Sequence, residues 1–359
     1  MSARVVVAMS GGVDSSVAAA LLKQQGHDVI GMMMRLWAEP STDGQVHNRC
    51  CTPGQMADAQ RIANMLDIPF YVLDTREVFR RKIVDFFVQG HRRGVTPNPC
   101  LECNRHIRFD WLQRHALALD ADYLATGHHA RICCDQDGNY RLLRAVDLQK
   151  DQSYVLSVMG QQQLAHAKFP VGNYHKSRIR EMAREFGLPT AAKQDSQDLC
   201  FLGDGDYRRF LRENVPDLPV AGPIMRRDGT HLGQHSGLAN YTIGQRRGLG
   251  INTTAPMYVG DIQPAKNALI VAERKEQGTQ RLEAGRFNWV AGSPPDNDFL
   301  AAVSVRYGAV PQPATITPLG PSAVGIEFEQ SQVGVAPGQA AVIFAEHECL
   351  GGGVIRLTE

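Results

Sequence analysis

The sequence lacks a run of eighteen or more apolar residues, the length that a membrane-spanning helix needs. It also lacks the layout of a signal peptide, because its apolar N-terminal stretch, MSARVVVAMSGG, runs straight into a glycine turn. These two absences argue against a membrane-spanning or secreted protein. We therefore expect a cytoplasmic protein with no membrane contact.

An excess of charge of either sign is also missing. Lys and Arg total 38 against 37 for Asp and Glu, so the whole chain exerts little long-range attraction on a polyanion. Nucleic-acid binding would have to come from local basic clusters. Such clusters occur at 80–82, 91–93, 105–108, 208–209, 226–227 and 246–247. For any single cluster, a solvated surface is the commoner explanation.

Cysteine, by contrast, is plentiful, with eight residues. A reducing compartment argues against a disulfide framework, which leaves metal binding, redox chemistry or sulfur handling for the unusual ones. Cys100 and Cys103 form a C-x-x-C pair, but a zinc site needs two further ligands and the sequence has no second such pair. No role is assigned to Cys50, Cys51, Cys133, Cys134 and Cys349.

The first half of the chain alternates between short apolar runs and segments with helical periodicity. Strands separated by helices imply right-handed crossovers, so we predict an α/β fold with a doubly wound parallel sheet. The strands are predicted at 4–9, 27–37, 69–74 and 122–126, and the helices at 15–25, 54–67, 77–89 and 107–119.

Near residue 205 the chain becomes rich in Gly and Pro, and short strand candidates replace helical periodicity. Their spacing predicts small β domains, the last of them a β-barrel. The strands are predicted at 257–262, 268–271, 287–290, 300–307, 314–316, 325–328, 340–344 and 353–357.

The segment SGGVDSS, residues 10–16, lies where the first predicted strand turns into a helix. Its two glycines let the backbone approach an anion, and the helix N-terminus offers N–H groups and the positive end of a dipole. The segment lacks both the lysine of the G-x-x-x-x-G-K-[ST] loop and the G-x-G-x-x-G pattern. It resembles the PP-loop, SGGxDS, of ATP pyrophosphatases, which cut ATP between its α and β phosphates. That resemblance implies Mg²⁺ near Asp14.

Two cysteine motifs suit chemistry that uses a thiolate. Cys103 lies in TPNPCLECNRHIRF, ahead of a predicted helix and close to Arg105, His106 and Arg108, so we expect its thiol pKa to be lowered. Cys200 lies in DSQDLCFLGDGDY, at the end of the first half. The alternatives are half of a zinc site for the C-x-x-C pair and an inert buried thiol for Cys200.

Together these segments resemble one family nearly from end to end. The segments are the PP-loop, CCTPGQMADAQRIANMLDIPFYVLD, TPNPCxxCNRxIRF, DYLATGHHAR, KDQSYVLS, DSQDLCF, YTIGQRRGLGI, PGQAAV and LGGGVI. They are similar to those of the tRNA-specific 2-thiouridylases. The resemblance implies an ATP-pyrophosphatase domain at 1–205, a small central domain at 206–276 and a tRNA-assisting β-barrel at 277–359. It also implies thiolation of the wobble uridine of tRNAs for Lys, Glu and Gln, as a tRNA-uridine 2-sulfurtransferase.

The resemblance carries roles onto individual residues. Cys103 would be the nucleophile, and Cys200 would carry a persulfide. The residues that would bind ATP are Ala8, Met9, Ser10, Gly11, Gly12, Val13, Asp14, Ser15, Met34 and Gly127. Those that would contact tRNA are Asn98, Pro99, Cys100, His128, Lys150, Asp151, Gln152, Arg306, Tyr307 and Gln339. A cysteine desulfurase or sulfur-relay protein would donate sulfur to a monomeric enzyme.

One position departs from the pattern of many relatives. They carry Asp after the NP dipeptide, whereas this chain carries Cys100. An iron–sulfur cluster held by Cys100, Cys103 and Cys200 is therefore an alternative to the persulfide.

Two other functions compete. A PP-loop amidotransferase or synthetase would share the nucleotide loop but leave the cysteine motifs unexplained. A non-catalytic tRNA-binding module would have no need of an ATP loop.

Overall fold

The computed structural model describes residues 2–39, 52–194, 199–215 and 221–356. Its N-terminal part contains a parallel five-stranded sheet in the order β3-β2-β1-β4-β7. The strands are β1 (Arg4–Ala8), β2 (Asp28–Arg35), β3 (Phe70–Asp74), β4 (Tyr123–Ala125) and β7 (Ala167–Lys168). This confirms the predicted α/β class, and it places the four strands predicted in this half in one sheet.

Both faces of this sheet are covered, because the alternating side chains of its central strand enter two different cores. Val5 and Val7 belong to one core, and Val6 belongs to the other. The helices on the two faces are α1 (Val13–Gln24), α2 (Pro53–Met65), α9 (Lys176–Glu185), α7 (Ser153–Leu156) and α8 (Gln161–Ala165). The short 3-10 turn η3 (Pro170–Asn173) precedes α9.

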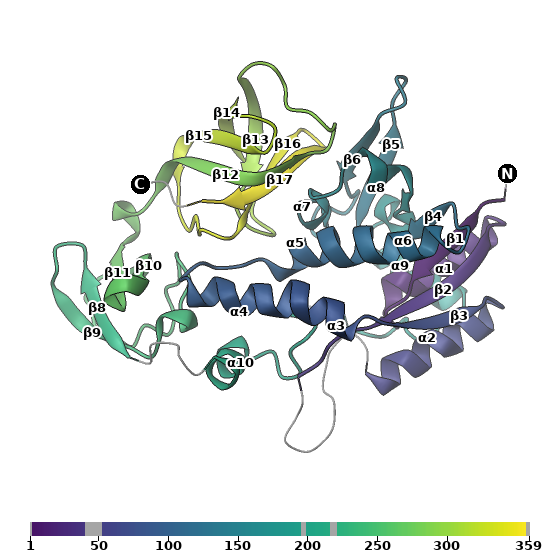
Figure 1. Cartoon of the computed structure of the whole chain (residues 1–359), viewed down its shortest axis with the longest axis horizontal. Coiled ribbons are helices and arrows are strands. Elements are labelled where there is room, and N and C mark those ends of the chain that lie inside the picture. Colours follow the sequence, from purple (N-terminus) through teal and green to yellow (C-terminus); the bar gives the residue numbers. More distant parts are fainter. Residues whose placement is uncertain (1, 40–51, 195–198, 216–220, 357–359) are drawn as a thin grey trace.

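Two longer helical stretches lie between this sheet and the rest of the molecule (Figure 1). The first comprises α3 (Arg76–Phe79), η1 (Arg80–Val84) and α4 (Asp85–Arg92). The second comprises α5 (Pro99–Cys103), η2 (Asn104–Leu112) and α6 (Gln113–Leu117).

The second stretch corrects the predicted helix at 107–119, because it begins at Pro99. Pro99 occupies its first turn, and the Asn98 side chain accepts a hydrogen bond from the Leu101 N–H at 3.1 Å. Cys103 therefore lies inside the helix rather than ahead of it.

The C-terminal part is a closed β-barrel, as predicted. Its strands follow the order β12-β15-β14-β13-β16-β17, and β12 also pairs with β17. They are β12 (Thr279–Trp289), β13 (Phe299–Ser304), β14 (Gln312–Pro318), β15 (Ala323–Gln332), β16 (Ala340–Ala345) and β17 (Glu348–Ile355). The strand predicted at 287–290 is longer and begins at Thr279. The sequence analysis missed its first half because buried and exposed residues alternate there, which gives a weaker apolar signal.

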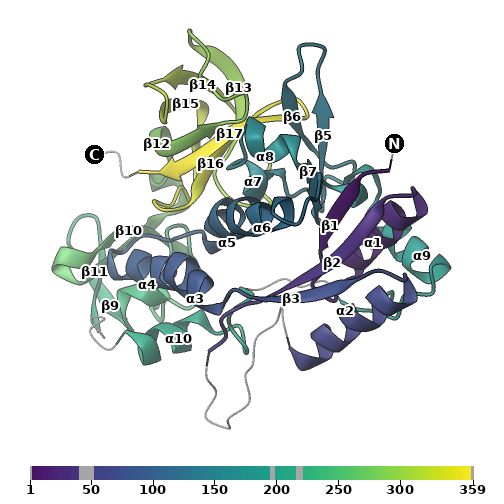
Figure 2. The same ribbon diagram turned by 45° about the vertical axis from the view of Figure 1, so that its right-hand side comes forward.

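A hairpin from the first half of the chain joins the barrel sheet. It consists of β5 (Ala130–Cys134) and β6 (Tyr140–Arg144), and β6 pairs with β17. Figure 2 shows the hairpin beside the barrel. The sequence analysis did not predict these strands.

The central part consists of a four-stranded sheet in the order β10-β11-β8-β9. Its elements are α10 (Tyr207–Asn214), β8 (Gly222–Arg226), β9 (His231–His235), η4 (Leu238–Asn240), β10 (Met257–Gln263), η5 (Pro264–Lys266), β11 (Ala268–Glu273) and η6 (Arg274–Glu276). The sequence analysis found β10 and β11 but not β8 and β9. Among the residues described here, no helix has the length and apolarity that crossing a membrane requires.

A buried histidine lies where α4 packs against α10. His91 is 7% exposed, its ring centroid lies 4.6 Å from that of Phe87, and it stacks on Tyr207 at 5.7 Å. Burial lowers the pKa of His91 to about 4. Between pH 6.5 and 4, the unfolded chain therefore binds a proton at His91 that the folded chain does not bind.

We expect this histidine to weaken the fold in acid. Because the unfolded state binds more protons, stability should fall by roughly 2–3 kcal/mol between pH 7 and pH 4.5. In His91→Phe, the free energy of unfolding should fall less between the two pH values, by that same amount. Urea titrations at pH 7 and pH 4.5 measure it. His231→Phe, at an exposed position on β9, is the control and should leave the loss unchanged. An equal acid loss in His91→Phe would contradict this account.

Candidate active site

The strand order places the nucleotide-binding loop at the point where the sheet changes direction. Strand β1 lies between β2 and β4, so the crossovers that leave β1 and β4 turn toward opposite edges. Ligands of open α/β sheets bind beside the carboxyl ends of the strands at such a point. The loop at 10–16 follows β1, and Gly127 follows β4. Both lie at this position.

Two glycines at this position cannot be replaced without displacing backbone. Gly11 has φ +69°, and a Cβ there would lie 2.4 Å from the carbonyl oxygen of Gln55. A Cβ on Gly127 would lie 2.6 Å from the backbone nitrogen of Ser15. The structure therefore brings Gly127 against the start of α1, and its ATP-binding role stays a prediction.

The start of α1 can receive an anion. Its N-cap residue, Gly12, has no side chain to bond the first N–H groups of this twelve-residue helix. The Ser16 hydroxyl donates to the Gly12 carbonyl at 2.7 Å, and the Ser10 N–H donates to the Ser15 hydroxyl at 3.2 Å. These hydrogen bonds fix the loop against the first turn of α1.

The other residues predicted to bind ATP lie on or next to β1, on β2, and at the start of α1. Ala8 ends β1, Met9 follows it, and the Met9 N–H donates to the Met32 carbonyl of β2 at 2.8 Å. Met34 lies on β2, and Val13 begins α1.

The carboxylate of Asp14 is held by two groups that the sequence analysis missed. The Lys176 ammonium donates to both carboxylate oxygens, at 2.6 and 2.7 Å, and His129 Nε2 lies 3.2 Å from one of them. Lys176 is 8% exposed and His129 is 3% exposed. Burial raises the pKa of Asp14, but His129 and Lys176 together outweigh it, and the pKa lies below its ordinary value.

A second lysine contacts the loop itself. The Lys193 ammonium donates to the Gly11 carbonyl at 3.0 Å and forms an ion pair with Asp58. Lys176 and Lys193 lie 162 and 182 residues beyond their partners in the loop. No local pattern could have signalled either contact, because both depend on how α9 and the segment after it return to α1.

Metal ions in proteins are held by groupings of side chains such as His, Cys, Asp and Glu. Within the described ranges, no three His, Cys, Asp or Glu side chains come together as a metal site requires. The alternative of a cluster held by Cys100, Cys103 and Cys200 stays a prediction. The Mg²⁺ predicted near Asp14 likewise stays a prediction.

The two cysteines predicted to handle sulfur pack on one core. Cys103 is 5% exposed within the core that also contains Val13 and Val17 of α1, and Cys200 is half-buried against the same core. The buried Phe201 anchors the chain next to Cys200, with its ring 5.5 Å from that of Phe87. Residues 195–198 of the Cys200 motif lie outside the described residues.

Several residues predicted to contact tRNA meet where α5 faces the barrel. Cys100 is exposed on α5, and Tyr307 of the barrel is 52% exposed, next to Arg306, which is also exposed. Burial raises the pKa of Tyr307, the charges of Asp151 and Cys100 raise it further, and that of Lys150 opposes them. The structure therefore gathers residues from 100, 150–151 and 306–307 at one place.

Other predicted tRNA contacts have structural partners. His128 is buried, with Nδ1 2.7 Å from the Thr126 hydroxyl, and Asp151 accepts hydrogen bonds from Ala145 N–H and the Ser153 hydroxyl. The Gln152 side chain accepts from the His129 N–H at 2.9 Å. Pro99 is buried in the first turn of α5, and the Gln339 side chain donates to the Thr96 carbonyl at 3.0 Å.

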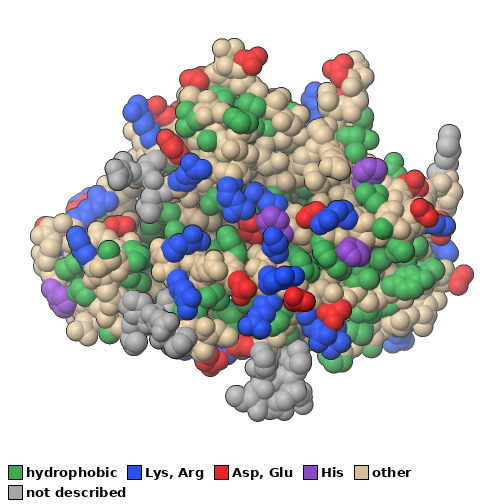
Figure 3. All heavy atoms as spheres, viewed as in Figure 1, with side chains coloured by type: hydrophobic (Ala, Val, Ile, Leu, Met, Phe, Trp, Pro, Cys, Tyr) green, Lys and Arg blue, Asp and Glu red, His purple; other side chains and the backbone are tan. Residues whose placement is uncertain are grey.

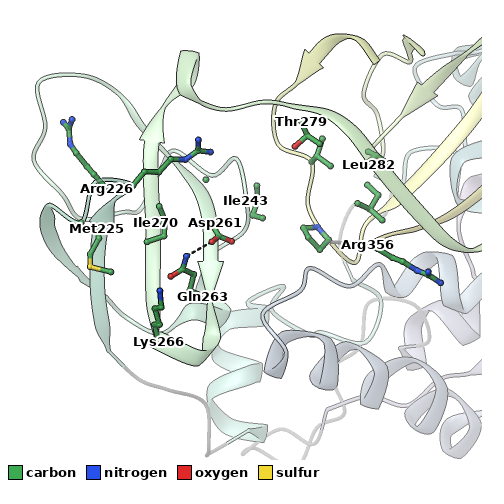
Figure 4. A pocket seen from close by; sticks show the side chains of 16 residues that line it. Met225, Arg226, Ile243, Asp261, Gln263, Lys266, Ile270, Thr279, Leu282 and Arg356 are labelled. Atoms are coloured by element: carbon green, nitrogen blue, oxygen red, sulfur yellow. Dashed lines mark hydrogen bonds between the residues drawn. The ribbon is translucent and has the colours of Figure 1, made fainter. Parts of the chain in front are cut away.

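The surface in this region is basic. Figure 3 shows Lys and Arg side chains gathered on the face above α4 and α5. A separate hollow of about 600 Å³ lies between the central sheet and the barrel, and Figure 4 shows side chains that line it. Its cationic lining residues are Arg226, Arg227, Lys266 and Arg356, and none of the predicted site residues lines it.

Family models match three successive parts of the chain. Residues 3–204 match the family described as the tRNA methyl transferase HUP domain, and residues 208–273 match the tRNA methyl transferase PRC-barrel domain. Residues 279–355 match the aminomethyltransferase beta-barrel domain. A solved 4-thiouridine synthetase–RNA complex with bound ATP is 15% identical, with a TM-score of 0.36, over 60% of this chain and 51% of that one.

Curated relatives match over the whole length. The tRNA-specific 2-thiouridylase MnmA of Chloroflexus aurantiacus is 46% identical over 357 residues, which cover 99% of both chains. The protein of the same name from Clostridioides difficile is 41% identical over 99% of this chain and 98% of its own. The resemblance inferred from the motifs is thereby confirmed, and the chain belongs to the tRNA-specific 2-thiouridylase family.

Proposed function

We propose that this protein uses ATP to replace the 2-oxygen of the wobble uridine in tRNAs for Lys, Glu and Gln with sulfur, as a tRNA-uridine 2-sulfurtransferase. The observation that carries the proposal is the glycine loop at the sheet's switch point. The buried Lys176 and the half-buried Lys193 flank this loop, and it packs on the core that holds Cys103. Relatives of the same length bear the name of this activity. We also propose the domain division at 1–205, 206–276 and 277–359.

The first half-reaction is adenylation. The loop at 10–16 and the N-terminus of α1 would bind the phosphates of ATP, with Lys176 and Lys193 supplying positive charge. The uridine would leave its base stack, and its O2 would attack the α-phosphate and release pyrophosphate. Asp14 would be the residue that meets a Mg²⁺ on the triphosphate, which would neutralise part of the phosphate charge.

The second half-reaction is sulfur transfer. The terminal sulfur of a Cys200 persulfide would attack C2 of the adenylated base, and the C2–O bond would break to release AMP. The Cys103 thiolate would attack the Cys200 sulfur and break its bond to the transferred sulfur. A Cys103–Cys200 disulfide would remain, which an external reductant must open. A cysteine desulfurase or relay protein would supply the persulfide.

Release of pyrophosphate is the direct test. We expect the protein to release pyrophosphate from ATP only when one of its tRNAs is present. Release that depends on ammonia instead would indicate an amidotransferase or synthetase, and no release under any condition would indicate a binding module. Either of those two outcomes would refute the proposal.

The hollow between the central sheet and the barrel provides a second test, of RNA binding. No hydrogen bond or ion pair is found for the side chains of Arg227 or Lys266 among the described residues, whereas Asp261 in the same hollow accepts from Gln263 at 2.9 Å. Cations without carboxylate partners suit a phosphate backbone. We propose that tRNA crosses this hollow.

Arg227→Gln combined with Lys266→Gln should weaken tRNA binding. If each cation meets one phosphate, the slope of log K against log salt should become shallower by about 1–2. The turnover rate at saturating tRNA should not change, because the hollow is lined by none of the predicted site residues. Arg178→Gln, which removes an ion pair with Glu185 on α9, is the control. An unchanged salt slope in the double variant would exclude tRNA from the hollow.

A further inference from the structure

The barrel is attached to the chain just before the helix that carries Cys103. The Thr96 N–H donates to the Pro337 carbonyl at 2.9 Å, and the Gln339 side chain donates to the Thr96 carbonyl at 3.0 Å. A Cβ on Gly338 would lie 2.8 Å from that same carbonyl oxygen, so the two segments are in close contact. The barrel thereby holds the residue three positions before the start of α5.

A second attachment lies next to Cys103 itself. Glu102 is 3% exposed, and its Oε2 accepts a hydrogen bond from Arg286 Nη2 of β12 at 2.8 Å. His106 Nε2 lies 3.2 Å from the same oxygen. A carboxylate buried to this degree is stable only when opposite charge and hydrogen bonds compensate it. Arg286 provides part of that compensation from the barrel, 184 residues further along the chain, beside His106 and the charge of Arg105.

The barrel strand is distorted where it supplies this side chain. The pairing of β12 with β17 shifts register between Gly285 and Asn288, and Arg286 between them has φ +49°. Residues other than glycine rarely adopt this left-handed conformation, and such irregularities are found where a side chain is re-aimed. Here the irregular residue is the one that reaches α5.

The remaining polar atoms around Glu102 do not replace Arg286. Glu102 Oε1, and the Nε and Nη2 atoms of Arg105, are buried without hydrogen-bond partners among the described residues. Arg105 therefore contributes charge near Glu102 but no hydrogen bond to it through these atoms. Without Arg286, the carboxylate beside Cys103 would keep His106 and the charge of Arg105, but it would lose its hydrogen bond to the barrel.

We propose that Arg286 is a positioning residue for sulfur transfer: through Glu102 it fixes α5 against the barrel and so fixes the place of the Cys103 thiol. This rests on the proposed role of Cys103. Displacing a reacting group by about 1 Å costs on the order of a hundredfold in rate. The nucleotide loop follows β1 and does not depend on this contact, so adenylation should proceed without it.

The test compares the two half-reactions in Arg286→Met. We expect the turnover rate of thiolation to fall about 10- to 100-fold, while KM for tRNA and the single-turnover rate of pyrophosphate release stay within about twofold. Arg286→Lys should recover part of the lost rate, because an ammonium can still pair with Glu102. Arg281→Met is the matched control on the same strand, since Arg281 is exposed and pairs with Glu327 of the barrel instead. It should behave as the unaltered protein does.

Glu102→Gln provides a second route to the same result if Arg286→Met does not fold. It keeps the shape of the side chain, removes the charge that Arg286 pairs with, and should separate the half-reactions in the same way. Equal loss of both half-reactions, a rise in KM alone, or unchanged thiolation would overturn the positioning role. Failure of the unaltered protein to thiolate tRNA would instead refute the proposed function.

Discussion

Lys176→Met should abolish most of the pyrophosphate release that tRNA triggers, by more than about 100-fold. The buried ammonium lies at the nucleotide loop, 2.6 Å from Asp14, where it would oppose the charge that develops on the phosphates. Its removal also leaves the half-buried Asp14 carboxylate with His129 as its remaining close partner among the described residues. Breaking this partly buried ion pair should lower the free energy of unfolding by about 1–2 kcal/mol.

Two comparisons separate the lost charge from lost stability. Asp14→Asn combined with Lys176→Met removes both charges, so it should recover stability without recovering pyrophosphate release. Lys23→Met is the control, because the exposed side chain of Lys23 on α1 donates to the Asp67 carbonyl and to no carboxylate among the described residues. Rapid-quench measurement of pyrophosphate and urea titrations provide the two readouts. Release within about fivefold of the unaltered protein in Lys176→Met would show that the lysine is not part of the phosphate site.

Cys103→Ser and Cys200→Ser should each eliminate detectable thiolation. A serine hydroxyl can neither carry a transferable sulfur nor resolve a persulfide by forming a disulfide. Adenylation does not use these sulfur atoms, so single-turnover pyrophosphate release should remain within several-fold of the unaltered rate. The measurement is mass spectrometry of nucleosides from the treated tRNA, alongside pyrophosphate release.

Cys134→Ser is the matched control for these variants. Cys134 is exposed on β5, in the hairpin that extends the barrel sheet, and serine there should leave both half-reactions intact. Full thiolation by either Cys103→Ser or Cys200→Ser would be incompatible with the proposed sulfur transfer. Loss of thiolation in Cys134→Ser as well would point to general damage rather than chemistry.

The sequence by itself determined the elements whose signals are local. The RVVVA run predicted a buried central strand, the glycines at 11 and 12 predicted a loop that admits an anion, and the Gly-rich C-terminal half predicted a barrel. Each of these depends on side chains within a few residues of one another, so the order of residues is sufficient. The start of α5 could also have been found locally, because Asn98 and Pro99 are an N-cap and a first-turn residue.

Only the tertiary structure decided which distant groups complete the site. The partners of Asp14 and Gly11 are lysines far along the chain, and Glu102 is paired by a residue of the barrel. The β5–β6 hairpin likewise joins a sheet whose other strands come from the opposite end of the chain. When elements pack and exclude water, a buried charge is stable only beside a group of opposite charge or a hydrogen-bond partner. That partner can lie anywhere along the chain, so the spacing of residues in the sequence does not predict it.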